Sequence, residues 1–198
     1  FWQVPSLSLS PRPVQKPHPP IYRGTISPES FETAGVIGDN AFVVPWLTGP
    51  HPEVRSRVQR YRAVLKENGH PKTRTTFIFF LFVDPDHNVA MRDGRESTYN
   101  YTRLFTSFIP PDVLKTFKPE DPFKAFLDFA LAMPDQLEER AIVGTPAECR
   151  RRLKELNDEF DLDQVAFYFH AGARDPQRAR YGMELFANEV MPEFKNGH

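Results

Sequence analysis

Hydroxyl side chains gather just ahead of an expected helix near the start of the chain. Thr25, Ser27 and Ser30 follow Gly24, and Pro28 marks the beginning of an amphipathic stretch. A helix N-terminus offers free backbone N–H groups and the positive end of the helix dipole, which together bind phosphate, and a glycine lets a ligand approach the backbone. The segment is therefore a candidate phosphate site. The alternative is that Ser27 serves only as the helix N-cap.

Three further residues follow the ends of expected strands. Trp46 comes soon after the strand expected at 41–44, and His170 directly follows the strand expected at 164–169. Both should lie at the end of the sheet where enzymes built on parallel strands bind ligands. His170 is a candidate proton donor or hydrogen-bond partner, with a structural role as the alternative, and Trp46 is either a ring contact or a core residue. Gly172 is expected to give room near a ligand or to form a tight turn.

Several kinds of chemistry lack the residues that they need. A single cysteine, Cys149, permits no intramolecular disulfide, and the histidines lack metal-binding spacing, so no metal site is predicted. The glycine motifs of dinucleotide-binding folds, P-loop enzymes and α/β-hydrolases are missing. The formal net charge of −1 gives no attraction to nucleic acid or to an anionic membrane. The longest apolar run, 77–83, is far shorter than the roughly 20 residues of a membrane-spanning helix.

The elements that must position these residues alternate along the chain. Four runs are almost continuously apolar, as in parallel strands that are covered on both faces. They lie at about 21–24, 41–44, 75–82 and 164–169. The order of strands and helices predicts an α/β architecture.

Prolines mark where the helices between these strands should begin, because a proline costs no hydrogen bond in the first helical turn. Thr145-Pro146-Ala147-Glu148 is also a capping box. The expected starts are Pro28, Pro52, Pro85, Pro122, Pro146 and Pro176. The apolar faces expected to pack on the sheet are Val54, Val58, Tyr61 and Leu65 in one helix and Ala179, Met183, Phe186 and Val190 in the last.

Four strands in 198 residues cannot close an eight-stranded barrel, which typically takes about 250 residues. The chain is therefore either an open sheet or part of a larger barrel. The sequence opens on Phe1 without a signal-peptide pattern, so we expect a fragment or a processed piece. Residues 1–20 contain six prolines and should form an extended, irregular lead-in.

Four phrases resemble the bacterial luciferase-like, flavin-dependent monooxygenase family. They are PRPVQKPHPP at 11–20, TISPES with AG and GD at 25–39, AIVGTPAEC at 141–149, and YFHAG with MELF at 168–186. They follow the order and spacing of the family and cover most of the chain. The stretch from about 92 to 140 fits less well, and we interpret it as a variable helical insertion on the substrate side of one domain, 1–198.

The resemblance implies the C-terminal part of a (β/α)₈ TIM barrel with parallel strands, incomplete in this chain. It implies a cytoplasmic, bacterial monooxygenase that uses reduced FMN and O₂ to oxidise an organic substrate. The full-length protein would be active and this chain alone inactive. The catalytic residues are unknown, because much of that machinery belongs to the absent half and His170 does not match the family's best-known catalytic histidine. The flavin-binding candidates are Gly24, Thr25, Ser27, Ser30, Trp46 and Gly172.

Two alternatives stay open: a deazaflavin-dependent oxidoreductase, and a non-catalytic half-barrel remnant. Candidate partners are a separate flavin reductase, and either the missing N-terminal half or a second copy of the chain. The missing half or a second copy is needed because an incomplete barrel would expose large apolar side chains on its inner face. The side chains expected there are drawn from Phe42, Val44, Ile78, Phe80, Phe82, Phe167 and Phe169.

Overall fold

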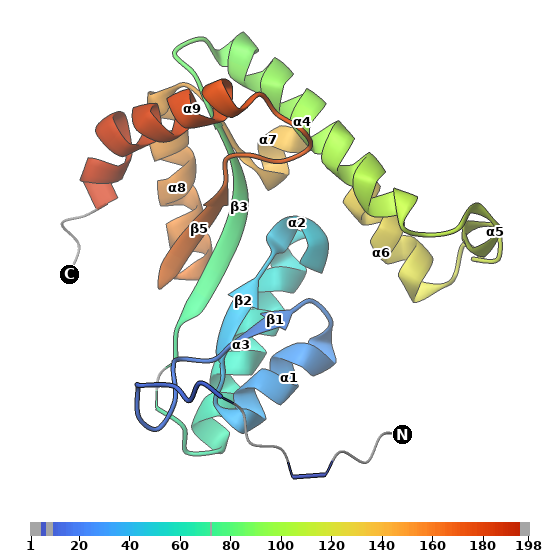
Figure 1. Cartoon of the computed structure of the whole chain (residues 1–198), viewed down its shortest axis with the longest axis vertical. Coiled ribbons are helices and arrows are strands. Elements are labelled where there is room, and N and C mark those ends of the chain that lie inside the picture. Colours follow the sequence, from blue (N-terminus) through green and yellow to red (C-terminus); the bar gives the residue numbers. More distant parts are fainter. Residues whose placement is uncertain (1–4, 7–9, 72, 195–198) are drawn as a thin grey trace.

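Parallel strands and helices alternate along the chain, as the sequence predicts (Figure 1). The computed structural model describes residues 5–6, 10–71 and 73–194. The strands are β1 (Tyr22–Thr25), β2 (Asn40–Val43), β3 (Thr75–Val83), β4 (Ile142–Gly144) and β5 (Gln164–Tyr168). The helices are α1 (Pro28–Ile37), α2 (Pro45–Thr48), α3 (His51–Glu67), α4 (His87–Ser107), α5 (Pro111–Leu114), α6 (Pro122–Leu131), α7 (Leu137–Arg140), α8 (Pro146–Phe160), α9 (Pro176–Glu189) and the 3₁₀ turn η1 (Met191–Phe194).

The sheet contains the four predicted strands and one more. Strand β1 pairs with β2, β2 with β3, and β3 with β5, all in parallel. The additional strand, β4, pairs in parallel with Leu81–Val83 at the far end of β3. The sequence prediction missed β4 because its three residues run directly into the capping box of α8.

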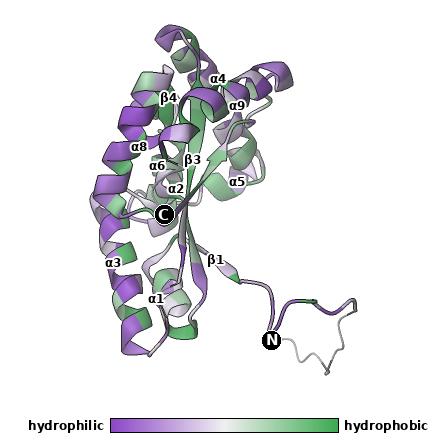
Figure 2. Ribbon diagram, turned by 90° about the vertical axis from the view of Figure 1, so that its left-hand side faces the viewer, coloured by the Kyte–Doolittle hydropathy of each residue, from purple (hydrophilic) through white to green (hydrophobic). Residues whose placement is uncertain are grey.

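Helices cover one face of the sheet (Figure 2). On that face, alternate side chains of β3 enter a core shared with α1, α3, α8 and α9, beginning with Phe77 and Phe79. The opposite face carries Phe80 and Phe82, which pack with α2, α4 and α7. We call this second surface the inner face, because it corresponds to the interior of a barrel.

Two expectations about side-chain direction are wrong. Phe167 and Phe169 point to the helix side, where their rings lie 4.9 and 5.8 Å from the ring of Phe186 in α9. In α9 itself, Met183 is 50% exposed, and Leu185 takes the buried position instead. An unbroken apolar run fits either face of a sheet, so its composition does not fix which residues turn inward.

Most predicted helix starts are confirmed, including the capping box of α8. Helix α4 is an exception, because it begins at His87 rather than at Pro85. The Asp84 carboxylate accepts a hydrogen bond from the backbone N–H of Asp86, and the Asp86 carboxylate caps the helix at Asn88. Pro85 therefore lies inside a short turn that precedes the helix.

Helices α4, α5 and α6 form an arm that extends from one end of the sheet (Figure 1). This arm occupies much of the stretch from 92 to 140, and α5 buries no residue. Residues 10–20 of the lead-in are exposed and form no helix or strand; residues 1–4 and 7–9 lie outside the described part. No helix in the described ranges is both long and apolar enough to cross a membrane.

Candidate functional site

The sequence-predicted site residues follow the C-terminal ends of neighbouring parallel strands. Thr25 ends β1, Trp46 lies in α2 just after β2, and His170 comes two residues after β5. Because these strands run in parallel through β3, their C-terminal ends form one rim of the sheet. The three residues follow the C-terminal ends of parallel strands, as the sequence predicts, and a site shared by all three stays a prediction. Ligands bind at this rim in parallel α/β barrels.

Two of the three loop hydroxyls are already engaged with the backbone. Thr25 is fully buried, and its hydroxyl donates to the carbonyl of Phe42 over 2.8 Å. The Ser30 hydroxyl donates to the carbonyl of Ser27 over 2.6 Å and accepts from the backbone N–H of Ile26 over 2.9 Å. Since each hydroxyl has one proton, Thr25 and Ser30 shape the loop and have no proton left for a phosphate.

Ser27 and Gly24 differ from these residues because they face open space. Ser27 is exposed at the N-cap position of α1 and makes no side-chain cap bond. No atom lies within 4 Å of the position that a Cβ at Gly24 would take. A hydrogen bond from its own backbone and one from Ser27 lower the pKa of Glu29, so a carboxylate already lies in the first turn. A phosphate bound through Ser27, Gly24 and the N-terminus of α1 would therefore have to displace the Glu29 carboxylate from Ser27.

Arg57, which the sequence analysis did not single out, holds this loop in place. One guanidinium nitrogen donates to the carbonyls of Ile26 and Thr48, over 2.9 and 2.6 Å. The other forms an ion pair with Glu53 at 3.0 Å. Arg57 thus ties the loop after β1 to the end of α2. In the sequence, Arg57 lies beside the apolar face of α3 that includes Val54 and Val58. That position is the signal by which sequence reasoning could have identified Arg57.

Four aromatic side chains from four elements meet on the inner face near this rim. Trp46 is 3% exposed, and its ring lies 5.0 Å from Phe80 and 5.6 Å from Tyr101. Tyr168 of β5 lies 5.3 Å from Phe80 and 6.4 Å from Tyr101. We call Trp46, Phe80, Tyr101 and Tyr168 the aromatic wall. Burial, and then the neighbouring Tyr168, raise the pKa of Tyr101, so this phenol remains neutral at physiological pH.

The remaining two candidates, His170 and Gly172, have different surroundings. His170 is exposed beyond the end of β5. Gly172 has a φ of +58°, and a Cβ there would lie 1.8 Å from the carbonyl oxygen of Ser97 in α4. The Ser97 hydroxyl also donates to the carbonyl of Ala171 over 2.5 Å. Close contact with α4 therefore explains the glycine, which supports the tight-turn interpretation.

This half-barrel, with a helix N-terminus and an aromatic wall on one rim, is matched by a family of known proteins. The family model described as "Luciferase-like monooxygenase" matches residues 1–161. The chain belongs to this family. The resemblance that was inferred from four sequence phrases is thereby confirmed.

Luciferase-like relatives extend well beyond the length of this chain. The oxygenase component of flavin-dependent trigonelline monooxygenase from Acinetobacter baylyi is 24% identical over 200 residues, covering 98% of this chain and 54% of the relative. The monooxygenase RslO1 from Streptomyces bottropensis superimposes with a TM-score of 0.72 at 23% identity, covering 93% of this chain and 51% of RslO1. An F420-dependent secondary alcohol dehydrogenase superimposes with a TM-score of 0.59 at 18% identity, covering 87% of this chain and 48% of that enzyme. The chain thus spans about half the length of these proteins.

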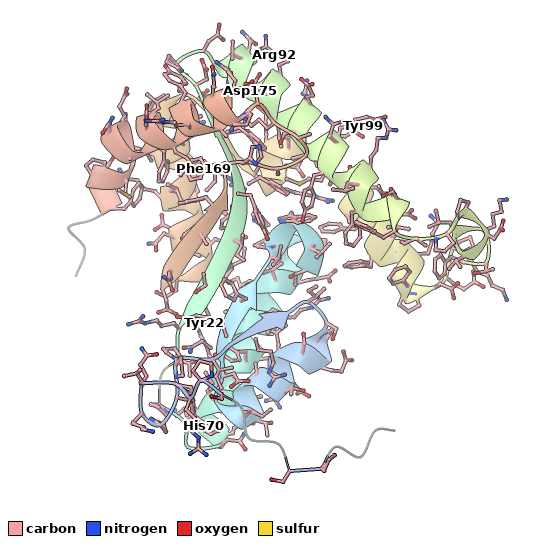
Figure 3. All side chains as sticks on the ribbon, viewed as in Figure 1. Tyr22, His70, Arg92, Tyr99, Phe169 and Asp175 are labelled. Carbon is pink, nitrogen blue, oxygen red and sulfur yellow. The ribbon has the colours of Figure 1, made fainter. Side chains whose placement is uncertain are left out.

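An ion-pair network lies where α9 meets α4, near the C-terminal end of β3 (Figure 3, Arg92 and Asp175). Arg178 of α9 reaches Asp93 of α4 at 2.7 Å and Asp84, just after β3, at 3.0 Å. Arg174, 9% exposed, donates to the carbonyl of Phe169 over 2.9 Å. Burial opposes ionisation of Asp93, but hydrogen bonds from Arg178 and Arg92 outweigh it and lower its pKa.

This network predicts an acid-dependent loss of stability. A carboxylate whose pKa is lowered by folding stabilises the protein above its unfolded pKa of about 3.9, and this contribution disappears as pH falls through its folded pKa. We expect Asp93→Asn to reduce the free energy of unfolding by about 2 kcal/mol at pH 7. Urea unfolding as a function of pH would measure this difference, which should shrink below about pH 4. A difference independent of pH would show that the ionised carboxylate is not responsible.

Proposed function

We propose that this chain is the C-terminal portion of the oxygenase component of a bacterial, cytoplasmic, FMN-dependent monooxygenase. With reduced FMN and O₂, the whole protein would oxidise an organic substrate. One observation carries the proposal within this family: the open N-terminus of α1, with Ser27 and Gly24, shares a rim with the aromatic wall. The related trigonelline monooxygenase is itself named as an oxygenase component. A separate flavin reductase is therefore the proposed partner.

Once the Glu29 carboxylate is displaced, Ser27 and the backbone N–H of Glu29 would hold the FMN phosphate, while Thr25, Ser30 and Arg57 keep the loop in shape. Trp46 is 3% exposed, so it would support the flavin site from behind Tyr101 and Phe80 instead of contacting the ring directly. The bound reduced flavin would supply the electrons that activate O₂. The apolar side chains of the aromatic wall would exclude water from the reacting groups. His170 stays a candidate hydrogen-bond partner at the open end of β5.

The rest of the barrel would come from a complementary part of the protein. The five strands do not close into a barrel, and Phe42, Val44 and Ile78 on the inner face are only partly buried. We propose that the missing strands, or else a second copy of the chain, cover this face. The arm, within about 92–140, would be a variable insertion beside the substrate.

A deazaflavin-dependent oxidoreductase is the second candidate. It is favoured by the superposition on an F420-dependent secondary alcohol dehydrogenase, which has the same TM-score, 0.59, as the FMN-bound oxygenating constituent of 3,6-diketocamphane monooxygenase from Pseudomonas putida. Both cofactors carry a phosphate, so the loop at α1 suits either. A non-catalytic half-barrel remnant would bind neither.

Replacing Ser27 by alanine tests the phosphate site. We expect the dissociation constant for FMN to rise about 10- to 100-fold, because a hydrogen bond to a charged group contributes roughly 1.5–3 kcal/mol. Binding of riboflavin, which has no phosphate, should not change. Equilibrium titration of the longest natural form of the protein with both ligands measures this contrast.

Matched controls separate the phosphate role from helix capping. Ser107→Ala, at the end of α4 in the arm, should change neither affinity. Because Ser27 makes no side-chain cap bond, Ser27→Ala should leave the free energy of unfolding nearly unchanged. If that variant instead destabilised the fold by about 1 kcal/mol and bound FMN normally, Ser27 would be only an N-cap.

A further inference from the structure

The aromatic wall has two buried members and two that remain accessible. Trp46 and Phe80 are 3% and 0% exposed, whereas Tyr101 and Tyr168 are partly exposed. Phe167 and Phe169 pack against α9, so the alternation of β5 turns Tyr168 toward the inner face. The accessible part of the wall therefore consists of two phenol side chains, one from the sheet and one from the arm.

The hydroxyl groups of these tyrosines are also free to bind a ligand. In the ranges that the structure describes, neither hydroxyl has a hydrogen-bond partner, and neither oxygen is among the buried polar atoms that lack one. By contrast, the hydroxyl of Tyr61, at the other end of the sheet, donates to the carbonyl of Asp39 over 2.7 Å. Fully buried phenols usually find such a partner.

We propose that Tyr101 and Tyr168 bind a planar aromatic ring of the substrate, and that the substrate class is therefore aromatic or heteroaromatic. This inference rests on the proposed monooxygenase function. Aromatic rings attract one another in tilted and edge-to-face arrangements. The four rings of the wall already adopt such arrangements, with centroids 5.0–6.4 Å apart and interplanar angles of 37–81°. A further flat ring can continue the cluster, whereas a puckered aliphatic ring cannot make the same contacts.

The two hydroxyls would set the orientation of that ring. Each phenol can donate one hydrogen bond and accept others, so a polar substituent on the ring could be fixed from the sheet and from the arm. A site that provides such groups discriminates strongly against analogues that leave them unpaired. Tyr101 and Tyr168 would thus determine specificity as well as bind the ring.

Two carboxylates of equal charge and similar size test the inference. Benzoate has a flat aromatic ring, and cyclohexanecarboxylate has a puckered aliphatic one. Calorimetric titration of the longest natural form of the protein, with and without FMN, gives both dissociation constants. We expect benzoate to bind at least about fivefold more tightly. Equal affinities, or no binding of either compound, would overturn the proposal.

Variants of the two tyrosines test whether the preference for benzoate depends on the aromatic wall. We expect Tyr101→Leu and Tyr168→Leu each to abolish most of the preference for benzoate, and Tyr101→Phe to keep it. Tyr99 supplies the matched control, because it lies on the same helix but is 53% exposed and points away from the body (Figure 3). Tyr99→Leu should change neither affinity. A preference that survived both leucine variants would contradict the proposal, and the wild-type comparison decides it even if these variants do not fold.

The FMN titration separates this inference from the proposed function. If FMN binds but benzoate is not preferred, the substrate class is wrong and the flavin proposal stands. If benzoate is preferred through the two tyrosines but FMN does not bind, the monooxygenase proposal fails while the aromatic site remains.

Discussion

Replacing Gly172 by alanine should lower the free energy of unfolding by about 4 kcal/mol. The new Cβ would lie 1.8 Å from the carbonyl oxygen of Ser97, and the backbone there has a φ of +58°. Overpacking against a helix backbone costs roughly 1–3 kcal/mol or more, and the left-handed conformation costs a non-glycine residue about 1–2 kcal/mol. Urea unfolding followed by circular dichroism measures the change.

Gly69→Ala is the matched control. Gly69 also has a positive φ, +70°, but no atom lies within 4 Å of the position of its Cβ. We therefore expect a loss of only about 1 kcal/mol from the backbone conformation. If both variants lost the same stability, the close approach of the 171–174 turn to α4 would not be a constraint on the fold.

The second large effect is expected for Phe80→Ala. Phe80 is fully buried and contacts the other three members of the aromatic wall. Truncating a buried phenylalanine typically costs about 3–5 kcal/mol, from lost contacts and the cavity that remains. The emission of Trp46 should also shift to longer wavelength as water reaches its indole, when measured in a Trp2→Phe background.

Phe108→Ala provides the comparison for Phe80→Ala. Phe108 is 77% exposed at the end of α4, and exposed substitutions usually change stability by less than about 0.5 kcal/mol. An equal loss from both variants, or unchanged Trp46 emission in Phe80→Ala, would show that the wall is not packed as described.

The sequence predicted the parallel sheet because hydrophobic runs record burial on both faces. The run at 75–82 corresponds closely to β3, and the predicted stripe of Val54, Val58, Tyr61 and Leu65 is buried in α3. The strand β4 and the direction of Phe167 could not be predicted in the same way. A three-residue strand has no periodicity, and a run without polar residues does not mark its inward face.

The candidate site was predictable in position but not in detail. Ser27 was placed at a helix N-terminus by the proline that follows it, and Trp46 by the strand that precedes it. The engagement of the Thr25 hydroxyl with Phe42, 17 residues away, depends on strand pairing that no local pattern specifies. Tyr101 joins the wall because α4 brings its ring within 5.6 Å of Trp46, so a stretch interpreted as a variable insertion supplied a residue of the proposed site.

We propose that this chain forms half of a luciferase-like barrel and cannot hold flavin on its incompletely covered inner face. Sedimentation velocity of the 198-residue chain with FMN, recorded at both protein and flavin absorbance, tests it most directly. We predict that the chain associates with itself or aggregates through its open sheet, and that no flavin sediments with a monomer. A monodisperse monomer carrying one FMN would contradict the claim and would mean that these strands form a complete flavin site.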